Sequence, residues 1–121
     1  MPDQRVPDVS DADVERVALR DFGSDSLPTV LALLQSYGNE TWHGAPARVR
    51  LAAMKLADGD IEELATMVKA ASDDYRDVLA WAEYPQSCKT FAHELPADQR
   101  RRIYDADWQQ YQRWLNGDPI G

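Results

Sequence analysis

The spacing of apolar residues is the feature that most limits how this chain can fold. Along most of its 121 residues, apolar side chains recur three or four positions apart, as on the buried face of an amphipathic helix. β-Branched residues do not alternate cleanly with polar ones in any stretch, so the sequence shows no strand pattern. We therefore predict an all-α fold, a single-domain bundle of about five to six short helices.

Capping residues and helix breakers divide the chain into these helices. Ser10 followed by Asp13 has the pattern of a capping box, and Asp60 with Glu63 predicts a second such start. Pro85 is expected to close a helix, because the residue before a proline disfavours helical geometry. The predicted helices cover about 10–22, 26–38, 46–58, 60–71, 72 or 73–84, and 96–115.

The third predicted helix carries apolar residues on two sides. One face holds Val49, Ala52, Ala53 and Leu56, and Leu51 and Met54 point roughly the other way. A helix that is apolar on two sides is usually covered on both. We therefore expect it at the centre of the bundle.

Length and the N-terminal sequence indicate a simple domain organisation. Residues 1–9 contain two prolines and no periodicity, which predicts a loosely ordered N-terminal arm before a single helical domain at 10–121. The first residues lack an apolar run behind a basic cluster, and the single cysteine, Cys88, excludes an intramolecular disulfide. These features predict a cytoplasmic protein.

The charge balance argues against two classes of partner. The chain carries 21 acidic and 13 basic residues, a net charge of −8, and residues 60–84 alone hold seven acids and two bases. Nucleic acids and anionic membrane surfaces are bound mainly through Lys and Arg. We therefore expect neither nucleic acid nor membrane as a partner.

Metal, nucleophilic and phosphate chemistry find little support. Glu40 and His43 have the spacing of a di-iron motif, but that site needs the motif twice. Cys88 and His93 lie five residues apart, yet a catalytic pair also needs spatial contact and an orienting third group. The glycines form no phosphate-binding loop. We predict no cofactor and no metal, and no catalytic residues are assigned.

Two edges combine aromatic and acidic residues. On the predicted fifth helix, Asp74, Asp77, Trp81 and Tyr84 fall along one edge, and Trp81 is expected to widen the core face. This edge is interpreted as first-turn charge followed by a packed aromatic residue. The alternative is an acidic, aromatic-rimmed surface for a basic partner.

The C-terminal helix carries the second edge. Its stripe consists of Tyr104, Trp108, Tyr111 and Leu115, with Asp107 beside it. We expect the stripe to dock on the bundle, and Asp107 then needs hydrogen bonds or a cation, for which Arg48 or Arg50 is predicted. If the stripe were exposed instead, it would be a surface for a partner or a dimer.

The block 53–85 gives one resemblance. Its segments 55–60 (KLADGD) and 74–85 (DYRDVLAWAEYP) are similar to a small family of uncharacterised bacterial α-helical proteins. The likeness covers about a third to a half of the chain. It implies a bacterial cytoplasmic protein and adds neither an activity nor site residues.

Three functions are compatible with these features. The first is a protein-interaction or accessory module, which could be a homodimer. The second is a small-ligand or enzymatic cleft between the central and C-terminal helices, with Asp77, Asp107, Arg48 and His43 as its polar groups. The third is an acidic binder of a basic protein, based on the charge of residues 60–84.

Overall fold

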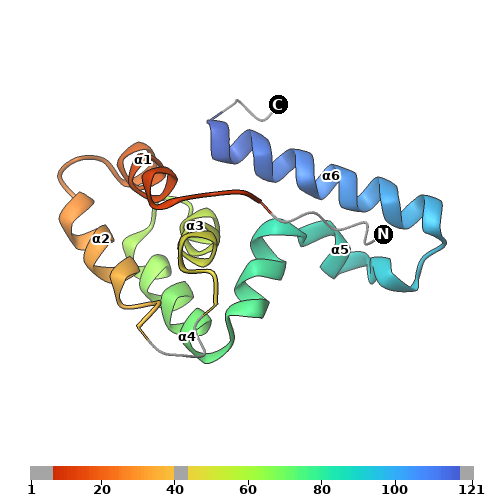
Figure 1. Cartoon of the computed structure of the whole chain (residues 1–121), viewed down its shortest axis with the longest axis horizontal. Coiled ribbons are helices and arrows are strands. Elements are labelled where there is room, and N and C mark those ends of the chain that lie inside the picture. The colour runs from red at the N-terminus through yellow and green to blue at the C-terminus, as the bar shows by residue number, and fades with distance from the viewer. Residues whose placement is uncertain (1–6, 40–43, 118–121) are drawn as a thin grey trace.

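The computed structural model describes residues 7–39 and 44–117. Over these ranges every regular element is a helix, and no strand is present (Figure 1). The helices are α1 (Asp11–Phe22), α2 (Leu27–Gln35), α3 (Pro46–Ala57), α4 (Ile61–Glu83), α5 (Pro85–Thr90) and α6 (Ala97–Asn116), with the short 3-10 helix η1 (Ala92–Glu94) before α6. The predicted all-α bundle of about six helices is confirmed.

Local capping explains where several helices begin. The backbone N–H of Ser10 donates to the Asp13 carboxylate at 3.0 Å, which completes the predicted capping box of α1. Asp60 Oδ1 accepts hydrogen bonds from the backbone N–H groups of Glu62 and Glu63, at 2.9 and 3.2 Å. Both predicted N-caps are therefore confirmed.

A kink at Asp74 divides α4. The backbone of Asp74 is extended (φ −155°, ψ 99°), and its Oδ1 accepts a hydrogen bond from the Arg76 N–H at 3.1 Å. Asp74 is thus the N-cap of the second half of α4. The predicted start at residue 72 or 73 was one or two residues early, and the two predicted helices run into each other without a loop.

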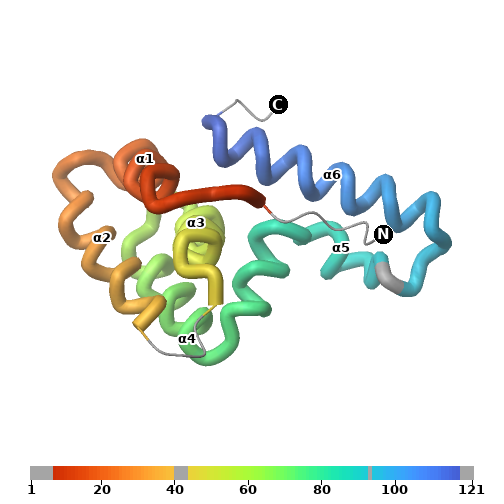
Figure 2. The backbone as a smooth tube through the Cα atoms, in the orientation of Figure 1, coloured from red at the N-terminus to blue at the C-terminus, as the bar shows by residue number. Residues whose placement is uncertain are grey.

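The helix α3 lies at the centre of the first part of the fold, among α1, α2 and α4 (Figure 2). Leu51, Ala52 and Met54 have no exposed surface, and Val49 is almost as buried. Side chains on both faces of α3 are therefore covered, as its two apolar sides predict.

The last turn of α6 is held by α1. Arg16 and Arg20 both donate to the carbonyl oxygen of Leu115, at 2.9 and 3.1 Å, and the Arg20 guanidinium lies 5.4 Å from the centre of the Trp114 ring. Such donors satisfy carbonyl groups that have no partner within the helix. These bonds connect the chain's first helix with its last.

The aromatic stripe of α6 is packed against the rest of the protein. Tyr104, Tyr111 and Leu115 are buried, and Trp108 is half-buried. The docked arrangement is confirmed, and the alternative of an exposed stripe is wrong.

Around the end of α4, the prediction for Trp81 is wrong and the prediction for Pro85 is confirmed but incomplete. Trp81 does not widen the core face, because 45% of its surface is exposed. Pro85 ends α4 but also begins α5, which the sequence pattern did not predict. Proline suits the first position of a helix because no hydrogen bond is lost there.

Candidate functional site

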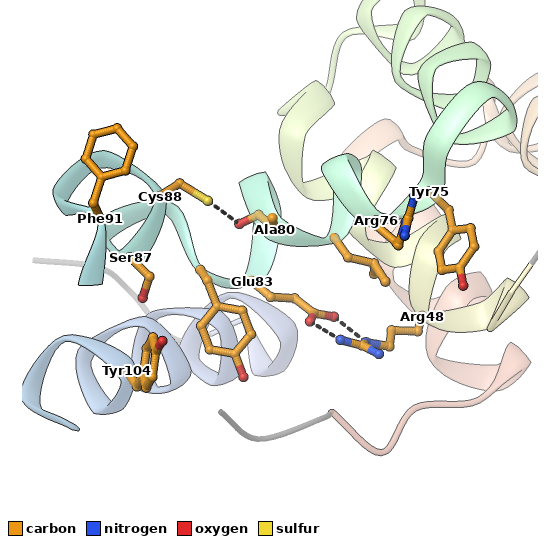
Figure 3. A pocket seen from close by; sticks show the side chains of 11 residues that line it. Arg48, Tyr75, Arg76, Ala80, Glu83, Ser87, Cys88, Phe91 and Tyr104 are labelled. Carbon is orange, nitrogen blue, oxygen red and sulfur yellow. Dashed lines mark hydrogen bonds and ion pairs between the residues drawn. The ribbon is translucent and has the colours of Figure 1, made fainter. Parts of the chain in front are cut away.

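A groove lies between the second half of α4 and α5, and we call it the α4–α5 groove. Its volume is about 720 Å³, within the range of roughly 300–1,000 Å³ of small-molecule sites. Arg48 of α3 and Tyr104 of α6 complete its lining (Figure 3). Arg48, Tyr75 and Arg76 lie toward one end, which we call the arginine end, and Cys88 and Phe91 lie toward the other.

A buried ion pair forms the middle of the groove wall. Arg48 Nε and Nη2 donate to the two carboxylate oxygens of Glu83 at 2.7 and 2.6 Å. Glu83 is only 2% exposed. The hydrogen bonds with Glu83 raise the pKa of Arg48 above its ordinary value, although burial opposes this shift. Because the pair is bidentate, it fixes the direction of the guanidinium plane.

Four aromatic rings line the groove. Tyr84 and Tyr104 meet edge to face, with ring centres 5.9 Å apart, and form a small apolar cluster with Ala92. Tyr75 packs against Gly44 so closely that a Cβ at residue 44 would lie 2.8 Å from the ring. Phe91 is the most exposed of the four. Because Tyr84 and Tyr104 are each only 8% exposed, Tyr75 and Phe91 supply most of the exposed ring surface beside the Arg48–Glu83 pair.

Phe91 adopts an unusual backbone conformation. Its φ of +52° places it in the left-handed region at the C-terminus of α5, where glycine is the common residue. A bulky residue there is a strained exception, yet 61% of Phe91 is exposed. Full burial of the ring therefore does not compensate this strain. Strained residues of this kind are concentrated at functional sites.

Arg76 is held more loosely than Arg48. It also forms a bidentate ion pair, with Asp74 at 3.0 and 3.2 Å, but its side chain is 78% exposed. Exposed pairs of this kind contribute little to stability and rearrange readily. Exchanging Asp74 for a ligand oxygen would therefore cost Arg76 less than breaking a buried pair.

Two α6 side chains fix the α4–α5 junction. Asp107, fully buried, accepts hydrogen bonds from Gln86 N–H at 3.1 Å, Ser87 N–H at 2.9 Å and Ser87 O–H at 2.8 Å. The Gln110 amide donates to the carbonyl oxygens of Ala82 and Glu83 at 3.3 and 3.5 Å. Backbone carbonyl groups at the end of α4 and backbone N–H groups at the start of α5 thus both find hydrogen-bond partners on α6.

The predicted partner of Asp107 is therefore wrong. Arg48 binds Glu83, and Arg50 donates to the carbonyl oxygens of Leu34 and Tyr37 at 2.9 and 2.6 Å. Backbone N–H groups, which carry no sequence signature, take the place of the expected cation. Lys55 on α3 is a charged side chain near Asp107. Burial lowers the pKa of Lys55, and the charge of Asp107 opposes this shift.

Cys88 is exposed at the edge of the groove. Its Sγ lies 3.6 Å from the carbonyl oxygen of Ala80. Burial raises the pKa of the thiol, and the charges of Asp107 and Asp77 raise it further. Since the thiolate is the reactive form, this position does not activate Cys88 as a nucleophile.

The predicted site residues are only partly brought together. Arg48, Tyr84 and Tyr104 line the groove. Asp74 and Asp107 each bind a residue of its lining. The other predicted residues do not line it: Asp77, Trp81, Trp108 and Tyr111. His43, like Glu40, lies outside the described residues.

The sequence reasoning did not select Glu83, Tyr75, Arg76 or Phe91. Glu83 did carry a signal, because an acid in the last turn of a helix is electrostatically unfavourable and needs a specific partner. The other three have no distinctive spacing. Their proximity depends on the kink in α4 and on α5.

The described residues offer neither a metal-binding cluster nor a membrane-spanning helix. Within residues 7–39 and 44–117, no three His, Cys, Asp or Glu side chains are grouped so that they could hold a metal ion. Over the same ranges, no helix combines the length and apolar character needed to cross a bilayer.

Comparison with protein families, with curated proteins and with solved structures found no match.

Proposed function

We propose that this protein binds a small organic molecule in the α4–α5 groove. The observation that carries the proposal is the fixed Arg48–Glu83 pair set among four aromatic rings in a groove of about 720 Å³. Ligand sites combine this kind of apolar surface with a few oriented polar groups. The predicted cleft lay between the central and C-terminal helices. The proposed site differs, because the second half of α4 and α5 supply most of its lining.

The groove is preorganised by contacts that do not involve a ligand. Glu83 orients Arg48, and α6 fixes the α4–α5 junction through Asp107 and Gln110. Preorganised groups bind more tightly because less freedom is lost on binding. A cytoplasmic location fits the single cysteine and stays part of this proposal.

A neutral fluorescent probe tests the proposal directly. N-Phenyl-1-naphthylamine, whose emission rises in apolar surroundings, is titrated into the protein and into Phe91→Ala. Saturable binding is expected, with an affinity about two- to tenfold lower in the variant, since one aromatic contact is lost. Leu19→Ala is the matched control, because Leu19 is 49% exposed and lies on α1, outside the groove.

The single cysteine provides a second measurement at the same site. Cys88 lines the groove, so bound probe should slow its alkylation by iodoacetamide. Probe emission that does not saturate, or that falls equally in both variants, would contradict the proposal. Unchanged alkylation of Cys88 at saturating probe would also count against it.

Trp81 supports a second candidate function, which is protein interaction, including formation of a homodimer. Nearly half of its ring system is exposed on α4, and exposed Trp side chains are enriched at interfaces. Sedimentation velocity at several protein concentrations tests the dimer. Association that Trp81→Ala weakens would support it, and a monomer at all concentrations would exclude this homodimer.

A further inference from the structure

Hydrogen-bond donors remain available at the arginine end of the groove. Two of the three Arg48 nitrogens are bound to Glu83, whereas Nη1 donates to no residue in the described ranges. Arg76 adds a second guanidinium, whose ion pair with Asp74 is exposed to solvent. A guanidinium has five N–H donors and no acceptor, so this end favours ligand oxygen atoms.

A cationic ligand has no comparable partner there. Glu83 is the carboxylate in the groove lining, and each of its oxygens already accepts a hydrogen bond from Arg48. A ligand cation would have to displace Arg48 from Glu83 or Arg76 from Asp74, because each guanidinium already pairs with a carboxylate. Breaking a buried ion pair is costly, because a charge is left without its partner.

The opposite end of the groove is lined by Ser87, Cys88 and Phe91, and no guanidinium is among these lining residues (Figure 3). A carboxylate placed here would have no guanidinium partner, whereas an apolar or aromatic body would contact the exposed Phe91 ring.

We infer that the ligand of the α4–α5 groove is a small anion with an aromatic body. Its anionic group lies at the arginine end, beside Arg48 and Arg76, and its aromatic body extends toward Phe91. The inference rests on the proposed small-ligand binding and adds the charge and the orientation of the ligand.

Three naphthalene probes of similar size and different charge test the inference. These are 2-naphthoate, 2-naphthamide and 2-naphthylmethylamine, each titrated into the full chain by isothermal calorimetry. The carboxylate should bind at least about fivefold more tightly than the amide, because charge-assisted hydrogen bonds are roughly twice as strong as neutral ones. The amine should bind most weakly.

Variants then locate the anionic group. Arg76→Ala should weaken binding of 2-naphthoate about two- to fivefold, as expected for one exposed charge contact, and should leave 2-naphthamide unchanged. Lys69→Ala is the matched control, because it removes one positive charge from an exposed position of α4 outside the groove. Circular dichroism of both variants checks that they fold.

Each outcome bears on a different statement. Equal or tighter binding of the amide or the amine would overturn the inferred charge and leave the proposed binding function standing. Equal losses in Arg76→Ala and Lys69→Ala would overturn the position of the anionic group. If none of the three probes and no neutral probe binds, both proposals fail. Cys88 alkylation that slows with protein concentration alone would identify a second copy as the occupant and overturn the inference.

Discussion

Removal of the Asp107 carboxylate is the sharpest test of how α6 supports the groove. In Asp107→Ala, three hydrogen-bond donors lose their acceptor: Gln86 N–H, Ser87 N–H and Ser87 O–H. Gln86 is exposed, so water can replace the lost bond, whereas Ser87 is buried. Each buried unsatisfied donor costs about 1–3 kcal/mol, so the two groups of Ser87 predict a loss of about 2–6 kcal/mol.

This loss is large for a domain of this size. The free energy of unfolding of small domains is about 5–15 kcal/mol, so Asp107→Ala should shift the urea midpoint strongly or unfold the protein. Asp107→Asn keeps one acceptor oxygen and should lose less than Asp107→Ala. Asp98→Ala is the control, because Asp98 is an exposed acid on the same helix.

Urea unfolding followed by tryptophan fluorescence measures these losses. Hydrogen exchange adds a local measurement, since the amide of Ser87 should exchange faster in Asp107→Asn than in the wild type. In a double-mutant cycle, Asp107→Ala and Ser87→Ala should couple by more than about 0.5 kcal/mol. A loss below about 1 kcal/mol in Asp107→Ala, or additive effects in the cycle, would refute this account of the junction.

Three further predictions concern single side chains. The buried Tyr111 hydroxyl has no hydrogen-bond partner within residues 7–39 and 44–117, so Tyr111→Phe should keep or raise the free energy of unfolding by up to about 1 kcal/mol; a loss above about 1 kcal/mol would contradict this. Phe91→Gly should be about 1 kcal/mol more stable than Phe91→Ala in urea, because only glycine avoids the cost of positive φ; equal midpoints would argue against strain. The pKa of Asp13 is lowered from 3.8 chiefly by the hydrogen bond from the Ser10 backbone N–H, so Asp13 stabilises the fold above that pH and less as pH falls through its lower folded pKa. Asp13→Ala should therefore cost about 0.5–1 kcal/mol at pH 7, and urea unfolding should show this difference shrinking below about pH 4; a constant difference would exclude the linkage.

Elements governed by local rules could be predicted from the sequence. The starts of α1 and α4 depend on side chains within three residues, Ser10 with Asp13 and Asp60 with its following N–H groups. The central position of α3 follows from its two apolar sides, which must both be covered. These features need no knowledge of distant parts of the chain.

The helix α5 could not be predicted, because it depends on a contact that is distant in sequence. It has six residues and no apolar stripe, and its first N–H groups are capped by Asp107, which lies about 20 residues away in sequence. The break in α4 was misplaced within a run of polar residues, 72–74, because each of them can act as an N-cap. Which of them does so depends on how the two halves of α4 pack.

The Arg48–Glu83 pair shows how a local conflict in the sequence can indicate a distant contact. Glu83 lies in the last turn of α4, where the helix dipole disfavours a negative charge, and it is almost fully buried there. A buried carboxylate at such a position persists only with a strong partner, and Arg48, 35 residues away, provides a bidentate one. The same pair removes the groove's carboxylate from use by a ligand and leaves Arg48 Nη1 as a donor. Glu83, whose charge the helix dipole disfavours, is therefore the residue behind the charge preference proposed for the groove.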